Sequence, residues 1–403
     1  MSQQGYLQIN SLTWEKDTHG LFDYESKVVY HKKAFVITSS CNIFRTLNDC
    51  HVPEYEDSLS STGLLRVERR PLGFQVSLIE ANASSKMWLV IRKLNNSAVA
   101  GYKLSEGDWL KMGRIRFKVI GVCVQPGKAR NSLLPQFFSC EKKEEQLQEE
   151  DCDGSEDCSQ KSACRICLSE AETGIDPLIY PCKCAGTMKF IHLNCLKEWL
   201  KCKITAKVSD KGMSFHIKDL VCELCKSPFP FIYKYKSQRI TLLNIDFPSK
   251  PYIILEEFRP DHHCRQALHL IALNSKQSAS IGRGHDCEIK ISDISVSRKH
   301  CKITLIDNNF YLEDLKSKFG TLAKIKKTFS LKPRYDVTVQ INRTVLEIEY
   351  KVPWSIRDLC NCCGGQRVVT DSFSYLTQPE FHDSESDQEN SRLHLTNSNF
   401  RVI

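Results

Sequence analysis

Short apolar or alternating runs, broken by polar and turn-forming stretches, predict β-strands along much of this chain. In the first third these runs are Lys27–Thr38, Leu64–Val67, Phe74–Ile79, Met87–Ile91 and Ile115–Val124. A second block has the runs Tyr252–Leu255, Leu268–Leu273, Cys301–Ile306, Phe310–Leu315, Val337–Ile341 and Val345–Tyr350. We therefore expect a multidomain, mainly β protein with two β-rich regions.

Two polar stretches indicate where the chain leaves these regions. Glu141–Asp157 contains nine carboxylates and almost no apolar side chains, so it cannot bury enough surface to become ordered. The serine-rich end of the chain is acidic at Asp383–Glu389. These features predict a β-rich N-terminal domain at 1–126, a disordered linker at 127–160, a compact module at 161–234, a second β-rich domain at 250–351 and a disordered tail at 360–403.

Two segments share the order "Asp, strand, Arg, strand". They are Gly107–Val119 in the first β-rich region and Tyr335–Ile348 in the second. One interpretation is that the chain holds two copies of one β-sandwich type. The alternative is coincidence, because any two antiparallel hairpins share this rhythm.

Composition excludes some classes of protein. The 403 residues are 41% apolar and 26% charged, which is ordinary for a globular protein of two or three domains. No apolar run approaches the roughly 18 residues of a membrane span, so none is expected. The net charge of +8 is diffuse, and nucleic acid is not expected as a partner. No apolar leader follows Met1, which predicts an intracellular, cytoplasmic or nuclear location.

The 20 cysteines are the strongest chemical signal. In a reducing compartment, paired cysteines are typical of metal sites. Zn²⁺ takes four thiolate or imidazole ligands, and the segment from 164 to 225 offers two such sets in interleaved order. The first and third pairs are Cys164, Cys167, His192 and Cys195, and the second and fourth are Cys182, Cys184, Cys222 and Cys225. We expect two Zn²⁺ ions, and a helix over Leu193–Cys202.

This segment resembles the RING-CH (RING-variant) domain of ubiquitin ligases. The residues that carry the resemblance are Cys164-Arg-Ile-Cys167, Pro181-Cys-Lys-Cys-Ala-Gly-Thr187, Ile191-His-Leu-Asn-Cys-Leu-Lys-Glu-Trp-Leu200 and Cys222-Glu-Leu-Cys225. A PHD finger fits less well. Seven residues separate Cys184 from His192, and no tryptophan directly precedes Cys222.

The resemblance implies a small cross-braced α+β module that recruits a ubiquitin-loaded E2 enzyme and has no catalytic residue or organic cofactor of its own. By resemblance, Ile166 and Trp199 face the E2, and Lys226 clamps the E2 to its ubiquitin thioester. The alternative for Ile166 and Trp199 is packing around the zinc loops, and for Lys226 an ordinary solvated position. Glu223 departs from the proline of many RING domains.

The second β-rich region resembles the forkhead-associated (FHA) domain, a β-sandwich that binds phosphothreonine peptides. The resemblance is carried by Ala279–Gly284, Ile294–Cys301 and Leu312–Thr321. It implies that Arg283 and Ser297 contact the phosphate, with Arg298 beside them and Lys318 in the loop that shapes the pocket. Phe319 departs from the family, which has an asparagine there. The alternative is a sandwich used only as a scaffold.

Together these resemblances predict an E3 ubiquitin ligase that recruits an E2 through RING-CH and a phosphothreonine-containing protein through FHA. A non-enzymatic phosphopeptide-binding adaptor with a structural zinc module is the alternative. A PHD-like chromatin reader is a third. No function can be predicted for residues 1–126. One interpretation of their β-rich pattern is a degenerate FHA-like sandwich.

Overall fold

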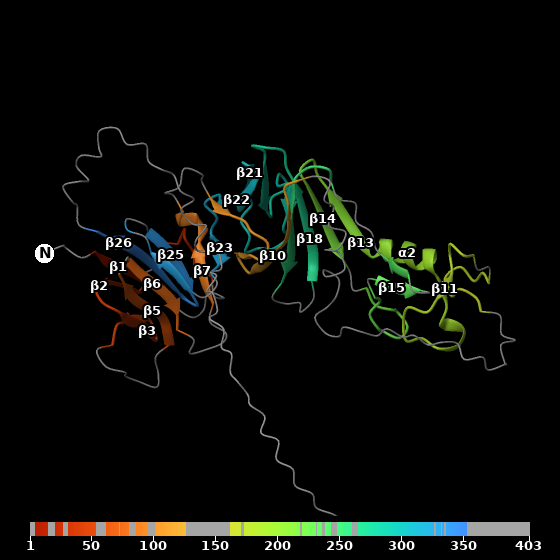
Figure 1. Cartoon of the computed structure of the whole chain (residues 1–403), viewed down its shortest axis with the longest axis horizontal. Coiled ribbons are helices and arrows are strands. Elements are labelled where there is room, and N and C mark those ends of the chain that lie inside the picture. Colours follow the sequence, from red (N-terminus) through yellow and green to blue (C-terminus); the bar gives the residue numbers. More distant parts are fainter. Residues whose placement is uncertain are drawn as a thin grey trace, which may run out of the picture.

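Two β-sandwiches and a small module that contains α2 (Leu193–Cys202) lie in a row in the computed structural model (Figure 1). The structure describes residues 5–259 and 265–352, apart from 15–20, 27–30, 54–61, 72, 80–85, 95–100, 126–161, 171–172, 218–219, 231, 236–237, 243–247, 326–327, 332 and 334–335. The prediction of a mainly β protein is confirmed. The predicted linker at 127–160 and tail at 360–403 lie outside the described residues.

The first sandwich combines strands from both ends of the chain. Its strands are β1 (Tyr6–Thr13), β2 (His31–Ile37), β3 (Cys41–Thr46), β4 (Asp49–His51), β5 (Thr62–Arg70), β6 (Gly73–Leu78), β7 (Met87–Val90), β24 (Thr328–Leu331), β25 (Asp336–Ile341) and β26 (Thr344–Lys351). One layer has the order β24-β6-β5-β3-β4, and the other has the order β7-β25-β26-β1-β2. The layers meet where the ring of Phe74 packs edge-on against Tyr350, with centroids 5.2 Å apart.

The second sandwich shares a sheet with the first. Its strands are β8 (Tyr102–Lys103), β9 (Trp109–Met112), β10 (Ile115–Cys123), β13 (Ile204–Val208), β14 (Gly212–Ile217), β17 (Tyr252–Phe258), β18 (Arg265–Ala272), β19 (Ser278–Gly282), β20 (Ile289–Lys290), β21 (Cys301–Ile306), β22 (Asn309–Asp314) and β23 (Thr321–Lys324). One layer is β20-β19-β21-β22-β8. The other, β13-β14-β18-β17-β10-β9-β23, continues through β7 into the first sandwich as a twelve-stranded sheet.

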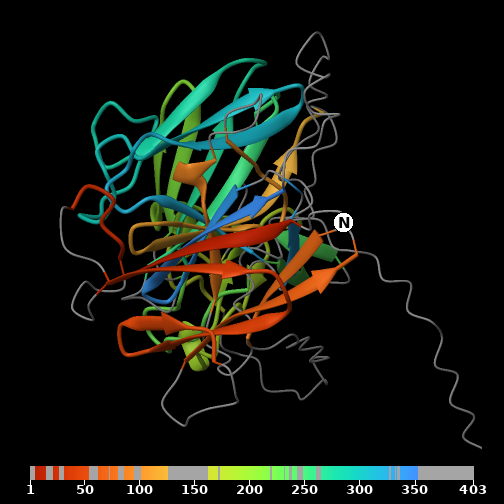
Figure 2. The same ribbon diagram turned by 90° about the vertical axis from the view of Figure 1, so that its left-hand side faces the viewer.

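The two sandwiches exchange hairpins. The hairpin β25–β26, near the end of the second block, pairs with β1 from Tyr6↔Lys351 to Thr13↔Thr344. The hairpin β9–β10, near the end of the first block, pairs with β17 from Arg116↔Phe258 to Cys123↔Tyr252. Figure 2 shows the red N-terminal strands beside the blue C-terminal strands. These are the two hairpins whose rhythm matches in the sequence.

This exchange bears on the predicted ranges 1–126 and 250–351. Each range supplies strands to both sandwiches, and buried residues from both ranges form one continuous core. The domain limits therefore stay a prediction made from the sequence, since the sheets join the two ranges.

Strand β1 is not among the strands predicted from the sequence. The strand alternates strictly between partly and fully buried positions, but two of its inward residues are the polar Ser11 and Thr13. Thr13 Oγ1 lies 3.1 Å from Thr344 Oγ1, and the Ser11 hydroxyl donates to Lys33 O at 3.2 Å, so both polar side chains have hydrogen-bond partners. A hydrophobicity pattern misses such a strand.

The small module is built around α2. Leu193, Leu196 and Leu200 are buried, and this spacing of three and four residues places them on one face of the helix. The helix has the bounds that the sequence predicts. Four short strands complete the module: β11 (Leu178–Ile179), β12 (Ile191–His192), β15 (Ile232–Tyr235) and β16 (Gln238–Thr241).

A hairpin inside the small module belongs to the second sandwich. Only Lys203 separates α2 from β13, and β13 turns back into β14. In turn, β14 pairs with β18 from Gly212↔Ile271 to His216↔Ala267. The sequence analysis predicted no strand in this segment, which runs between the third and fourth pairs of predicted zinc ligands.

Candidate functional site

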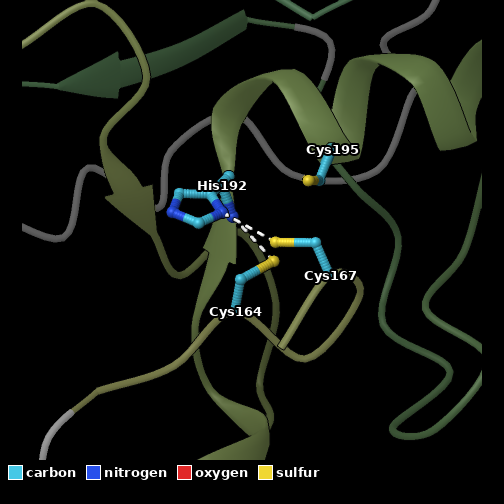
Figure 3. A group of neighbouring side chains, drawn as sticks. All are labelled: Cys164, Cys167, His192 and Cys195. Carbon is cyan, nitrogen blue, oxygen red and sulfur yellow. Dashed lines mark hydrogen bonds between the residues drawn. The ribbon is translucent and has the colours of Figure 1, made fainter. Parts of the chain in front are cut away.

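The first group of predicted ligands converges at the start of α2 (Figure 3). Cys164 and Cys167 come from one loop, His192 ends β12 and Cys195 lies in the first turn of α2. Their ligand atoms all lie within 4.8 Å of one another. Nδ1 of His192 faces this group and is 3.2 Å from Sγ of Cys167.

The second group forms in the same way from two more distant segments. Cys182 and Cys184 precede the short 3-10 helix η2 (Gly186–Met188), and Cys222 and Cys225 follow the β13–β14 hairpin. The four sulfur atoms also lie within 4.8 Å of one another. The structure therefore brings together the same two interleaved sets that spacing predicts.

Two Cys-x-x-Cys loops, which we call the first and second knuckles (164–169 and 222–227), have matching backbones. In the first, Leu168 N–H donates to Cys164 O at 2.7 Å; in the second, Lys226 N–H donates to Cys222 O at 2.9 Å. Leu168 and Lys226 both have a left-handed backbone, with φ of 63° and 57°. Each knuckle thus curls two cysteines around one point, which suits a shared ion.

The ionisation of the thiols also suits a bound cation. Burial opposes ionisation of Cys164, but backbone N–H groups directed at its sulfur outweigh it and hold the pKa at about 6. The Ser227 hydroxyl holds the pKa of Cys225 at about 6. Burial and neighbouring thiols raise the pKa of Cys182 and of Cys195 to about 12. Neighbouring thiolates repel one another, so the thiols of one cluster cannot all ionise without a cation between them. A bound divalent ion supplies that positive charge.

The donor sets fit zinc. Three thiols with one imidazole, and four thiols, are the ligand sets of structural zinc sites, and all positions are filled by protein. Both clusters could therefore hold one Zn²⁺ each. Bound zinc would supply structure and not reaction chemistry, because neither set leaves an open coordination position.

The three residues predicted to face an E2 differ in their surroundings. Ile166 is 43% exposed in the first knuckle, and Lys226 is exposed at the end of the second. Trp199 is half-buried: its ring packs edge-on against Phe229 at 5.5 Å, and Lys203 Nζ lies 4.5 Å from its centroid. Trp199 therefore has a packing role whether or not it contacts a partner.

Sequence reasoning missed two exposed apolar side chains in the knuckles. Leu168 and Leu224 are 77% and 56% exposed, one in each knuckle. Exposed leucines in tight turns are a signature of a contact surface when they gather in one place. The signal in the sequence was available, since both lie inside or directly after a Cys-x-x-Cys motif.

Three of the predicted phosphate-facing residues lie on two loops that His300 joins, with Ser297 and Arg298 on one loop and Lys318 on the other. Nδ1 of His300 accepts the Ser297 N–H at 3.1 Å, and Nε2 lies 3.3 Å from the carbonyl of Gly320. This pattern requires a neutral ring with its proton on Nε2. The N–H of Lys318 then donates to Ser297 Oγ at 3.0 Å, which places Ser297 and Lys318 side by side.

Arg283 lies on a third loop, which follows β19 and is bonded through its backbone to the loop of Ser297. Its N–H donates to Ser297 O at 3.0 Å, and Gly284 N–H donates to Arg298 O at 2.9 Å. A Cβ on Gly282 would lie only 2.2 Å from Arg298 O, so glycine is required for this close approach. Arg298 is exposed beside them. The structure therefore gathers Arg283, Ser297, Arg298 and Lys318 on one end of the sandwich.

Segments of the N-terminal region support the two loops that His300 joins. Lys318 Nζ pairs with Asp23 at 3.3 Å, and Tyr24 N–H donates to Lys318 O at 2.9 Å. On the other loop, Arg114 donates to Asp293 at 3.0 Å from its guanidinium and to Ser295 Oγ at 2.9 Å from its backbone. Residues 1–126 thus have a structural role that no motif indicated, because these contacts join positions far apart in sequence.

Comparison with known proteins agrees with both resemblances. Residues 164–225 match the RING-variant domain model, and residues 279–335 match the FHA domain model. The mouse protein "E3 ubiquitin-protein ligase MARCHF7" is 38% identical over 72 residues, which are 18% of this chain and 10% of that protein. Human "E3 ubiquitin-protein ligase MARCHF6" is 40% identical over 75 residues, 19% of this chain and 7% of that protein. The chain thus spans a tenth or less of the length of these two relatives.

One solved structure, a crystal structure of the FhaA FHA domain in a complex, is similar at 21% identity and a TM-score of 0.11 over 20% of this chain and 87% of that one. Within the described residues, no helix has the length and apolar content that crossing a membrane requires. The chain contains a RING-variant domain with two clusters that could each hold a zinc ion, and an FHA domain.

Proposed function

We propose that this chain is a RING-type E3 ubiquitin ligase that recruits an E2 through its RING-variant domain and a phosphothreonine-containing protein through its FHA domain. The observation that carries the proposal is the pair of matching knuckles. Each curls around a cluster suited to zinc and presents an exposed apolar side chain, Ile166 in the first and Leu224 in the second. The curated relatives that match this segment are named as ubiquitin ligases.

In this proposal no covalent intermediate forms on the ligase. Ile166 and the exposed part of Trp199 contact the E2, and Lys226 holds the E2 and its ubiquitin thioester in a reactive geometry. The left-handed backbone of Lys226 supports this role, since it ends the knuckle tightly with the side chain exposed.

An assay with a panel of E2 enzymes tests the ligase. Zinc-loaded protein of all 403 residues should form ubiquitin conjugates with at least one E2, and Cys164→Ser should abolish them. Loss of an apolar anchor at an interface costs on the order of 1–2 kcal/mol, so Ile166→Ala should lower the rate roughly tenfold. Ile175, 87% exposed in the same module but outside both knuckles, provides the control: Ile175→Ala should have the wild-type rate. Inactivity with every E2 would contradict the proposal.

The FHA part of the proposal rests on the cationic end of the second sandwich. A phosphate offers several acceptor oxygens, which fixed cations and short hydroxyls satisfy. Arg283 and Lys318 supply the cations and Ser297 the hydroxyl. Phe319 cannot donate the hydrogen bond that an asparagine donates to the peptide backbone, so we expect affinity lower by ~1–3 kcal/mol than with asparagine. Binding substrate and E2 on one chain raises their effective concentration.

Fluorescence anisotropy with a phosphothreonine peptide library tests the second site. Arg283→Ala should weaken the best peptide at least about tenfold, because one charge-assisted contact contributes ~1.5–3 kcal/mol. Arg70, an exposed arginine of the first sandwich that pairs with Glu68, is the matched control. Phosphopeptide binding without ligase activity would favour the adaptor, and binding of unmodified histone tails would favour a chromatin reader.

We further propose an intracellular location, in the cytoplasm or the nucleus. Seven cysteines of the described part of the chain are gathered as metal ligands, a use of cysteine that is typical of a reducing compartment.

A further inference from the structure

Arg165 belongs to the first knuckle but contacts the second cluster. Its backbone lies between two residues of the first knuckle, Cys164 and Ile166. Its guanidinium instead reaches across the module, where Nη1 is 3.2 Å from Sγ of Cys184 and Nη2 is 3.4 Å from Sγ of Cys222. Nη1 is also 3.7 Å from Sγ of Cys182. One side chain therefore touches three of the four sulfur atoms of the other cluster.

The position of this side chain is fixed from both ends. Its backbone N–H donates to Phe190 O at 3.1 Å, and Nη1 donates to Met188 O at 2.9 Å. A guanidinium has five N–H donors in a planar fork, so it can keep the bond to Met188 and still direct N–H groups at several sulfurs. The point charge of a lysine lacks that geometry.

The charge of the second cluster explains why a cation lies there. With zinc bound, four thiolates give a formal charge of about −2, against about −1 for three thiolates and one imidazole. The guanidinium is placed at the more negative site. N–H···S bonds lower the energy of the thiolates and fix their orientation, as groups around the ligands do in metal sites generally.

We propose that Arg165 is a positioning residue for the second zinc site and ties the two zinc loops together. The first knuckle supplies the donors, and the thiolates of the second cluster accept them. Zinc loss from the second cluster therefore depends on a residue adjacent to a ligand of the first. The same contact sets the position of Ile166, the next residue, relative to the second knuckle.

Site-resolved metal binding of the full chain tests this proposal. Cobalt bound by four thiolates absorbs differently from cobalt bound by three thiolates and an imidazole, so the two sites can be titrated separately. Arg165→Gln should weaken the four-thiolate site ~10–100-fold, the usual effect of losing a partner of metal ligands. Arg165→Lys should give an intermediate loss. The site with three thiolates and one imidazole should keep its affinity for cobalt, although its ligand Cys164 is adjacent to Arg165 in the sequence.

Lys183 supplies the matched control, because it lies between Cys182 and Cys184 with an exposed side chain. Lys183→Gln also removes one positive charge from a residue adjacent to a zinc ligand in the sequence. It should leave the metal affinity of both sites unchanged. Release of zinc to a chelator, with counting of the ions lost, gives a second readout: one ion should leave faster from Arg165→Gln. Equal weakening of both sites, an unchanged four-thiolate site, or an Arg165→Lys variant equal to wild type would each overturn the proposal.

Discussion

The Ser214 hydroxyl lies 2.9 Å from Nδ1 of His269 in the buried junction between the zinc module and the second sandwich. Ser214 is on β14, between two pairs of zinc ligands, and His269 is on β18. Nε2 of His269 lies 2.8 Å from Glu257, which also accepts from Arg259 at 2.6 Å. A continuous chain of hydrogen bonds thus links β14, which lies between zinc ligands in the sequence, to β18 and β17 of the second sandwich.

Glu257→Ala should destabilise this junction. Glu257 is 1% exposed, and its removal leaves the partners of a buried charge unpaired, which costs ~3–5 kcal/mol. Urea unfolding followed by tryptophan fluorescence measures the change. The matched control is Glu198→Ala, since the Glu198–Lys201 pair is exposed and should contribute no more than ~0.5 kcal/mol. A similar loss for both variants would contradict this assignment.

The stability of the protein should fall as the pH drops below neutrality, in part through His300. Burial lowers the pKa of His300 below its ordinary value, while the charge of Asp314 acts in the opposite direction. The unfolded chain then binds a proton at about pH 6.5 that the folded ring resists, so stability decreases as the pH falls through that value.

His300→Asn should flatten this dependence, and thermal unfolding between pH 7.5 and 5 measures it. Glu257 affects the stability of the protein in a different pH range. Its pKa is lowered by His269 and Arg259 against the effect of burial, so its contribution is lost only in more acidic solution, below about pH 4. If the stability of His300→Asn falls as steeply as that of the wild type between pH 7.5 and 5, groups other than His300 cause the pH dependence.

Removing zinc should unfold the knuckles and leave β14 in place. The hydrogen bonds that close the knuckles, such as those from Leu168 and Lys226, have no support without the ion. The backbone of β14 instead pairs with β18 from Gly212 to His216. Hydrogen exchange with and without a chelator measures this. Exchange in β14 as fast as in the knuckles would contradict it, and added zinc should restore protection.

Cleaving the chain within 127–160 should leave two fragments associated. Each fragment holds a hairpin that completes the other's sandwich, through the pairs β1–β26 and β10–β17. Size-exclusion chromatography of protein cleaved at an inserted protease site should give one peak in buffer and two in urea. Ile9→Asp, at a fully buried position that pairs with Ile348, should separate the fragments. Gln8→Asp, at a partly exposed position of the same strand, should not. Two peaks for the cleaved wild-type protein in buffer would rule the exchange out.

Much of the local structure could be predicted from residues alone. The eight ligands, the bounds of α2 and many of the longer strands, such as β10, β17 and β26, follow from spacing and periodicity, which are properties of neighbours in the chain. The FHA motifs are also recognisable from neighbouring residues, but Gly282 and His300 serve contacts between motifs: Gly282 packs against Arg298 O, and His300 lies 3.3 Å from Gly320 O. The contacts with an E2 and with phosphothreonine stay predictions.

What the sequence determined by itself is which chemistry is present: two thiol-rich metal sites, a cationic loop pair and two β-rich blocks. Only the tertiary structure decided what these parts face. Alternation along β10 indicates its buried side but not its partner, since any strand edge offers the same N–H and C=O groups. The pairing of β1 with β26, of Lys318 with Asp23 and of Arg165 with the distant thiols depends on which surfaces meet when the chain closes on itself.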